Sequence, residues 1–374
     1  MFNKNTKPPQ TFRAFTASLM ISATAFTSGA AMAKDNIHAL YIPLADHYPA
    51  IVAHHKYAAT MTNANYSVEM MKSWPALSAK FMAGEADLAF IMAPLAMNMY
   101  NQKQNFKWVS LVHRDGSALA VNDIFLKDIP LASERHARKP TADFANAASR
   151  WMNSKGRPTI AAVPSLHSTH TVMLYKYLKD HGKTMSIGQG KADVLVKAVA
   201  PSDAPAYIQN QGKNGLAASF EQSLPWADIV EAGGYGKVVW YSKDVMKWPK
   251  GHVECIIIAS DNAIKNKTAA LREVIQTVHR AGKDIDHAMN TGGSAINNIA
   301  LLVNQHYIKQ HTVAAIKASL NKDLGVINYV NLNNDKPGLK IIMDLAVESG
   351  VMKKAIDIDT FADDSFASKI TVTQ

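Results

Sequence analysis

The hydrophobic pattern beyond residue 34 alternates between short apolar runs, typical of buried strands, and longer segments with apolar residues at three- and four-residue spacing, typical of helices. Its N-terminal part predicts strand, helix, strand, helix and strand, in that order, over residues 37–44, 47–62, 66–73, 74–85 and 86–94. Strands that alternate with helices favour a parallel sheet covered on both faces. The segment therefore predicts an α/β fold.

The middle of the chain repeats this alternation. It predicts a helix over 167–182, closed by Gly182 in the position of a C-cap. Four further strands are expected over 156–164, 215–220, 236–242 and 254–260. After residue 260 the pattern is helical, over 267–289, 293–307 and 312–320. The sequence thus predicts two α/β units with a helical C-terminal tail.

The length of the chain favours two domains. Without its first 33 residues, the 374-residue chain is still longer than one hydrophobic core usually spans. Loop-like stretches at 127–140 and 241–251 are the candidates for crossings between domains. Two crossings would insert one lobe into the other and form a hinge, with a ligand cleft between the lobes. We expect a discontinuous lobe I over 34–118 and 250–374, and an inserted lobe II over 119–249.

The first 33 residues have the pattern of a cleavable signal peptide. Lys4, Lys7 and Arg13 form a basic start without acids, residues 14–26 are modestly apolar, and small residues precede Lys34. No later segment is apolar for long enough to span a membrane. We therefore expect export, a soluble mature protein and a location in the periplasm.

Charge and cysteine content narrow the classes of partner. The formal net charge is +10, and three of the basic residues lie in the leader, so the chain after the leader carries +7. This positive charge suits an anionic ligand or a negatively charged surface. The lysines are scattered and do not alternate with aromatic residues, so we expect no nucleic-acid partner. The single cysteine, Cys255, lies in an apolar run and is expected to be a buried core thiol.

Four turns that follow strands and precede helices are candidate ligand sites. In open α/β sheets, ligands gather at the carboxyl ends of strands, where helix N-termini present free N–H groups. The first turn has Asp46 and His47 as expected caps, and the second has Ser73 as N-cap before Trp74 and Pro75. The third and fourth turns contain Pro94 and the run Ser168, Thr169 and His170.

Most of these residues also have a plain structural interpretation. Ser165, Ser168 or Thr169 could each cap a helix without any ligand, whereas His170 could donate a hydrogen bond to an oxyanion. Trp74 could wall a pocket or pack against the core. Glu221 could receive an ammonium group or act as a cap, and Lys250 could neutralise an anion or remain solvated. The residues by themselves leave these alternatives open.

Local motifs give no support to catalysis or to a resident metal. Histidines are frequent at positions 38, 47, 54, 55, 167 and 170, but no HExxH motif and no Cys–His zinc spacing is present. Neither GxGxxG nor GxSxG follows a strand. We therefore predict no cofactor, no metal and no enzymatic activity.

Three segments together resemble a known family. Residues 73–100, "SWPALSAKFMAGEADLAFIMAPLAMNMY", residues 161–182, "AAVPSLHSTHTVMLYKYLKDHG", and residues 341–367 are similar to periplasmic solute-binding proteins of the nitrate/sulfonate/taurine/bicarbonate ABC-transporter class. The likeness covers nearly the whole chain after the leader.

The resemblance implies a fold and a set of site residues. It implies the type II periplasmic-binding fold: two lobes with mixed or parallel sheets flanked by helices, a two-segment hinge and a helical tail. It also implies an ABC-type permease as partner, and it places Trp74 and His170 in an anion pocket. Lys250 matches its family position only approximately, because the segment "KWPKG" lacks the acidic residue found there. The segment "SFEQSLPWADIV" lacks the Cys–Gly–Glu–Pro–Trp pattern of nitrate and bicarbonate members, so Glu221 leaves room for a zwitterion.

The sequence hence predicts a monomeric, exported protein that captures a small anionic or zwitterionic nutrient, sulfonate-like or oxyanion-like, and delivers it to a permease. A sensor subunit reporting to a membrane receptor is the first alternative, and an enzyme resembling thiamine-pyrimidine synthase is the second. The expected ligand-binding residues are His47, Trp74, Pro94, Ser168, Thr169, His170, Glu221 and Lys250.

Overall fold

The computed structural model describes residues 33–367. The predicted signal peptide, apart from Ala33, lies outside the described residues. Among the residues that are described, no helix is both long enough and apolar enough to cross a membrane.

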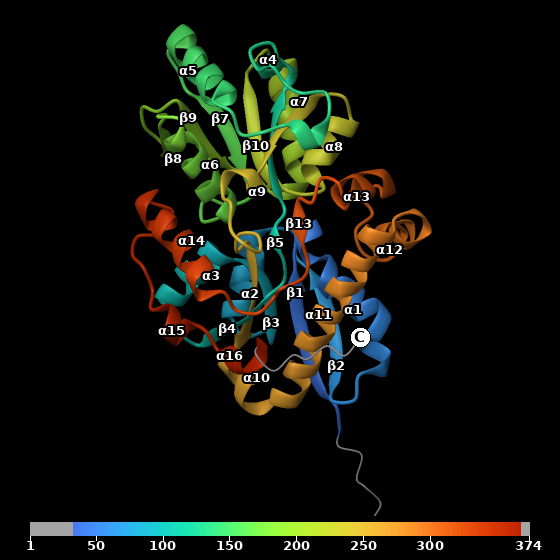
Figure 1. Cartoon of the computed structure of the whole chain (residues 1–374). Coiled ribbons are helices and arrows are strands. Elements are labelled where there is room, and N and C mark those ends of the chain that lie inside the picture. Colours follow the sequence, from blue (N-terminus) through green and yellow to red (C-terminus); the bar gives the residue numbers. More distant parts are fainter. Residues whose placement is uncertain (1–32, 368–374) are drawn as a thin grey trace, which may run out of the picture. The chain divides into compact units, whose positions relative to one another are not determined.

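The first of two large sheets combines four strands from the N-terminal part of the described chain with β12, which follows the whole second sheet in sequence (Figure 1). Its strand order is β2-β1-β3-β12-β4. Strand β1 pairs in parallel with β2 and β3, whereas β12 runs antiparallel to both β3 and β4. The strands are β1 (Asp35–Tyr41), β2 (Ala64–Met70), β3 (Leu88–Met92), β4 (Phe106–Leu111) and β12 (Cys255–Ser260).

The second sheet is formed by the middle of the chain, in the order β11-β6-β10-β7-β9-β8. Strands β10, β7, β9 and β8 are mutually parallel along this order, and β6 is antiparallel to β10 and β11. The strands are β6 (Ser117–Asn122), β7 (Thr159–Val163), β8 (Met185–Ile187), β9 (Val194–Ala198), β10 (Ala218–Ser223) and β11 (Gly236–Tyr241).

Both sheets are mixed because the chain passes between them twice. A helical crossover between strands of one sheet produces parallel neighbours, but β6 and β12 each enter their sheet directly from the other one and run antiparallel. The first passage, residues 112–116, contains the short β5 (Arg114–Asp115), which pairs with β13 (Ile327–Asn328). The second passage follows β11 and includes the predicted crossing at 241–251.

The other predicted crossing is wrong. Residues 127–140 join α4 (Asp123–Leu126) to α5 (Asp143–Lys155), after the chain has already entered the second sheet through β6. The error arose because a loop rich in proline and charge looks the same in sequence whether it links two lobes or two helices. The part of the chain beyond Ala33 forms one compact unit, so the lobe limits at 118/119 and 249/250 stay a prediction.

Helices cover the two sheets as the alternation predicts. Helix α11 (Thr268–Thr291) packs on α1 (Tyr48–Tyr57) and on β1 and β2 of the first sheet. Helices α6 (Thr169–Asp180), α7 (Ala204–Lys213) and α8 (Trp226–Ala232) contact β10 of the second. On the first sheet lie α1 (Tyr48–Tyr57), α2 (Trp74–Met82) and α3 (Ala93–Gln102). On the second sheet, in addition to α4 and α5, lie α6, α7, α8 and α9 (Ser242–Val245).

The predicted helical tail is confirmed. It comprises α10 (Asp261–Asn266), α11 (Thr268–Thr291), α12 (Gly293–His306), α13 (Val313–Ser319), α14 (Lys336–Glu348), α15 (Ile358–Phe361) and α16 (Asp364–Ala367). Helix α14 contacts both α3 and α6, and α13 contacts α8. The tail thus packs against elements that flank both sheets.

Two of the predicted helix ends are confirmed and one is not. Ser73 caps α2, because its Oγ accepts a hydrogen bond from the N–H of Ala76 at 3.3 Å. Gly182 follows α6 with a φ of +65°, the left-handed conformation that glycine adopts readily. Asp46 and His47 make no capping hydrogen bond to α1. Their side chains are used elsewhere, as described below.

Arg138 fixes the loop at 127–140 against the second sheet. Its guanidinium donates to both carboxylate oxygens of Glu231, at 2.7 and 2.9 Å, and to the carbonyl of Val238 at 2.9 Å. The Arg138 side chain is 3% exposed, whereas that of the adjacent Lys139, which pairs with Asp244 at 3.4 Å, is 53% exposed. The two neighbouring cations thus differ mainly in burial.

We expect Arg138→Met to lower the free energy of unfolding by about 3 kcal/mol, since it leaves the Glu231 carboxylate without its main partner. Lys139→Met is the matched control and should change the unfolding free energy by less than about 0.5 kcal/mol, because solvent already screens its pair. Urea denaturation of both variants tests this. Equal losses would show that Arg138 contributes no more than a surface cation.

A second prediction concerns His279 of α11, whose Nε2 lies 2.6 Å from Ser110 Oγ of β4. Burial lowers the pKa of His279 to about 4. The unfolded chain, with a histidine pKa near 6.5, therefore binds more protons between pH 6.5 and 4, and stability falls as the pH drops through this window. We expect His279→Gln to abolish about 3 kcal/mol of that acid-induced loss.

The measurement is the unfolding free energy of each protein at pH 7 and pH 4. His287→Gln is the control, since His287 lies on the same helix but is exposed. An unchanged pH dependence in His279→Gln would contradict the prediction.

Candidate functional site

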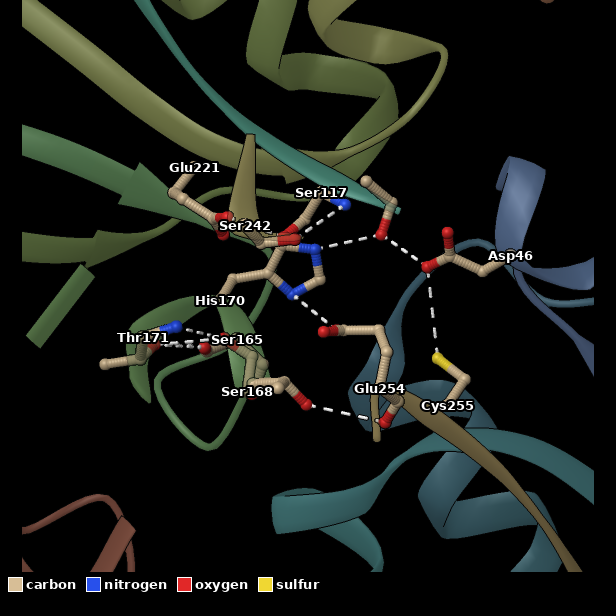
Figure 2. A network of polar contacts seen from close by, with 12 residues as sticks. Asp46, Ser117, Ser165, Ser168, His170, Thr171, Glu221, Ser242, Glu254 and Cys255 are labelled. Atoms are coloured by element: carbon tan, nitrogen blue, oxygen red, sulfur yellow. Dashed lines mark hydrogen bonds and ion pairs between the residues drawn. The ribbon is translucent and has the colours of Figure 1, made fainter. Parts of the chain in front are cut away.

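The candidate site is a set of buried polar side chains where the two sheets meet. We call it the polar cluster, and it consists of Asp46, His113, Ser117, His170, Glu221, Ser223, Glu254 and Cys255. Every member is fully buried. Figure 2 shows Asp46, His170, Glu254 and Cys255 with their side chains directed toward one another.

A chain of hydrogen bonds crosses the cluster from the first sheet to the second. Asp46 follows β1, and its Oδ2 accepts a hydrogen bond from Ser223 Oγ of β10 at 2.5 Å. The same hydroxyl lies 2.9 Å from His170 Nε2, at the start of α6. The other imidazole nitrogen, Nδ1, lies 3.4 Å from Glu254 Oε1, directly before β12. Ser223 thus joins a carboxyl group from one sheet to an imidazole from the other.

Hydrogen bonds to backbone carbonyls hold the same two regions together. The N–H of Ala45 donates to the carbonyl of Leu224 at 2.8 Å, and Trp226 Nε1 donates to the carbonyl of Pro43 at 3.0 Å. Asp46 and Ser223 are each next to one of these backbone partners in sequence. The backbone therefore fixes the approach of the two side chains.

Glu221 forms a second branch within the second sheet. It lies inside β10, opposite Leu119, so the predicted capping role is wrong. Its Oε1 accepts a hydrogen bond from Ser117 Oγ at 2.7 Å. Its other oxygen, Oε2, has no hydrogen-bond partner among the described residues.

Burial decides the charge of the cluster. Loss of solvent raises the pKa of Asp46 to about 8 and raises the pKa of Glu221 and Glu254 well above the usual carboxyl value. The same effect lowers the pKa of His170 to about 3 and that of His113 well below its usual value. Both shifts disfavour the charged forms, so burial opposes an ion pair between His170 and Glu254.

The cluster has an excess of acidic groups, since three of its members are carboxyls and none is lysine or arginine. Arg114 lies next to it in sequence, but its guanidinium is bonded to Asp335 at 2.8 Å and to the carbonyls of Gly251 and Asn331. Several polar atoms of the cluster also lack a hydrogen-bond partner within residues 33–367: Asp46 Oδ1, both nitrogens of His113, Glu221 Oε2 and both oxygens of Glu254. A positively charged group placed here would interact favourably with the acids.

The structure brings most of the sequence-predicted residues to this region. His170 and Glu221 belong to the cluster. Ser168 is the N-cap of α6, with its Oγ accepting from the N–H of Thr171 at 3.1 Å, and Thr169 Oγ1 donates to the carbonyl of Glu254 at 3.5 Å. Pro94 is buried in the first turn of α3, whose Ala93 N–H donates to the same carbonyl at 3.0 Å.

Trp74 and His47 lie together beside the cluster. Their rings are 5.9 Å apart in an edge-on arrangement. His47 Nδ1 accepts from the N–H of Ile42 at 3.0 Å, whereas His47 Nε2 and Trp74 Nε1 have no partner among the residues described. Trp74 also lines a groove of about 380 Å³ between α2, α3 and the loop with Ser165 and His167.

Lys250 is not brought together with these residues. Its side chain is exposed, and it lines a separate surface pocket with Arg114, Trp248 and Asp335. An anion in the polar cluster would therefore not be in contact with this ammonium group in the present arrangement.

Sequence reasoning missed Ser117, His113, Ser223 and Glu254 as site residues and assigned Cys255 only to the core. Cys255 is buried, as predicted. The one available signal was polarity at strand ends, because Glu254 directly precedes an apolar strand and His113 follows one. The sequence does not reveal that these ends meet.

Comparison with solved structures identifies the class of fold. The nitrate-binding protein of Synechocystis PCC 6803 superposes with a TM-score of 0.73 at 14% identity, over 90% of this chain and 88% of that one. A zinc-bound ligand-binding component of an ABC-type import system from Staphylococcus aureus gives 0.70 at 14% identity, over 91% and 100%. The aliphatic sulphonate-binding protein of Escherichia coli gives 0.61 at 14% identity, over 88% and 92%. The fold is that of periplasmic binding proteins, as predicted.

The family follows from the sequence itself. Residues 30–299 match the model of the NMT1-like family, and the chain belongs to that family. The comparison with curated proteins gives no match.

We expect Ser223→Ala to lower the free energy of unfolding by roughly 1–3 kcal/mol, because it leaves Asp46 Oδ2 and His170 Nε2 buried without their shared partner. Ser219→Ala is the control: Ser219 is equally buried on the same face of β10, and its Oγ has no partner among the described residues. The control should be neutral or slightly stabilising. Chemical denaturation of both variants at pH 7 tests this, and equal effects would mean that the hydrogen bonds through Ser223 contribute nothing.

Proposed function

We propose that the protein is an exported solute-binding protein that captures a small zwitterionic or anionic nutrient between its two sheets and delivers it to an ABC-type permease in the inner membrane. We further propose that it acts in the periplasm, as a monomer, by binding and not by catalysis. The fold supports the class, since the nitrate-binding and sulphonate-binding proteins named above share it.

The observation that carries the proposal is the set of unpartnered polar atoms in the polar cluster. Buried polar groups in proteins are nearly always hydrogen-bonded, and those that are not call for an explanation. Here Asp46, Glu221 and Glu254 come from different elements and lie in one buried region (Figure 2), where a solute would complete their hydrogen bonds. A ligand held between the sheets would also add contacts that exist only when the sheets are together, and closure follows from that difference.

The composition of the cluster favours a zwitterion over a simple anion. Three buried carboxyls would repel an anion if ionised, and no lysine or arginine of the cluster offsets them. An ammonium group would interact favourably with Glu221 Oε2 and Glu254, both of which lack partners among the described residues. The sulfonate-like or phosphonate-like end of the same ligand would accept a hydrogen bond from Trp74 Nε1, whereas His170 Nε2 is already bonded to Ser223 Oγ.

Catalysis by Cys255 is disfavoured by its surroundings. Burial, together with the nearby carboxyl groups of Asp46 and Glu254, raises the pKa of its thiol well above the usual value. A protonated thiol is a poor nucleophile. Binding is therefore the better use of the site.

The test compares two ligands of similar shape, an aminoalkanesulfonate and the alkanesulfonate that lacks the amino group. In a thermal-shift assay with a chelator present, a ligand at ~100 times its dissociation constant adds about 2.7 kcal/mol to stability. We expect the aminoalkanesulfonate to raise the unfolding midpoint, and Glu221→Gln to remove most of that rise because it replaces the carboxylate by an amide of the same shape. Aminophosphonates, nitrate, bicarbonate, sulfate and phosphate complete the screen.

Lys250→Ala is the matched control and should respond to the ligand like the parent protein, since its side chain lies outside the polar cluster. Stabilisation by the plain alkanesulfonate alone, unaffected by Glu221→Gln, would replace the zwitterion with an anion. No response to any solute would reject the proposed ligand class.

A further inference from the structure

Three members of the polar cluster form a compact set of nitrogen, oxygen and sulfur donors. Asp46 follows β1, His113 lies between β4 and β5, and Cys255 begins β12. One donor atom from each of the three lies within 4.8 Å of the other two, and all three residues are buried. They come from three distant segments, so no sequence motif connects them.

Several of the nitrogen and oxygen atoms that could bind a metal in these residues have no hydrogen-bond partner in the described part of the chain. Neither nitrogen of His113 has a hydrogen-bond partner within residues 33–367, and Asp46 Oδ1 has none either. The Cys255 thiol reaches only Asp46 Oδ2, at 3.9 Å, which is long even for sulfur. An imidazole with both nitrogens buried and unsatisfied is costly unless something else binds it.

We propose that Asp46, His113 and Cys255 bind a divalent transition-metal ion of the zinc type, with a fourth coordination position left open. The sequence analysis predicts no metal, and the fold alone brings these three side chains together. The metal site does not depend on the identity of the solute proposed above.

The distances suit tetrahedral coordination. Zinc binds histidine nitrogen and carboxylate oxygen at about 2.0–2.1 Å and thiolate sulfur at about 2.3 Å, so neighbouring ligand atoms lie about 3.3–3.6 Å apart. His113 Nε2 and Asp46 Oδ2 are 3.5 Å apart, and Cys255 Sγ lies 3.9 Å from the same oxygen. The third pair of donors, from Cys255 and His113, lies within 4.8 Å, so the side chains need to approach one another by at most about 1 Å to bind one ion.

The surroundings also fit a cation. Ser223 orients the Asp46 carboxyl group by a hydrogen bond to Oδ2, as residues behind a metal ligand commonly do. Gly116, at a φ of +100°, packs closely against the set: a Cβ there would lie 3.0 Å from Ile327 Cδ1 and 3.2 Å from both Asp46 Oδ1 and His113 Nδ1. A divalent cation would in addition offset the excess of carboxyl groups. Three protein ligands with one open position are typical of sites where zinc binds a further molecule.

Cobalt(II) is the probe, because a cobalt–thiolate bond gives charge-transfer absorption in the near ultraviolet and the chain has one cysteine. The purified protein, reduced and stripped with a chelator, is titrated with cobalt in the absence of solute. We expect one ion per chain with a thiolate band, displaced by one equivalent of zinc. Since the site is buried, a second sample is refolded in the presence of cobalt, so that slow entry cannot conceal binding.

Cys255→Ser should lose the band, and His113→Gln should weaken binding by roughly 100-fold. Circular dichroism checks that each variant is folded. The control is His306→Ala. His306 and His55 form an exposed pair of histidines with ring centroids 4.7 Å apart, and the variant removes one member of that pair. This variant should keep both the band and the stoichiometry.

The absence of a thiolate band in both the titrated and the refolded wild-type protein would overturn the proposal. So would a band that His113→Gln leaves unchanged, or metal binding that disappears only in His306→Ala. Because solute binding is tested with a chelator present and metal binding without solute, failure of one proposal is distinguishable from failure of the other.

Discussion

The cost of removing carboxyl groups from water is the constraint on which the site depends. Asp46, Glu221 and Glu254 are fully buried, and no lysine or arginine of the polar cluster pairs with them. A buried carboxylate without a cation is so unfavourable that the group binds a proton instead. The two sheets are joined at this point by hydrogen bonds through Ser223, and burial disfavours the ionised forms of the groups around it.

This constraint links the two proposals. Burial favours the protonated form of these carboxyls in the empty cluster, and each can release its proton when a positive charge arrives. An ammonium group and a divalent metal are two ways to supply that charge. The relatives that bind nitrate or sulphonate share the fold, but at 14% identity the fold does not determine the charge of the pocket.

The sequence predicted the fold far better than the site. Nearly all the strands and helices predicted from the alternating pattern are present, because each pattern depends on residues that are close in the chain. His170 was placed by its position before a helix, which is also a local signal. Asp46, His113 and Cys255 were not connected, because their proximity arises only from the pairing of distant strands. A capping role for Glu221 was left open because its strand continues three residues beyond the apolar run that predicted it.

The position of β12 has a consequence for how the chain folds. This strand lies between β3 and β4, yet it begins at Cys255, long after both of them in sequence. The first sheet cannot be completed until the whole of the second has been synthesised, and pairing between such distant segments is slow because the loop must close first. A newly made chain of this topology stays incompletely folded for longer than one with local pairing. For a protein with a predicted export signal, that delay would leave time for an unfolded chain to enter a translocation channel.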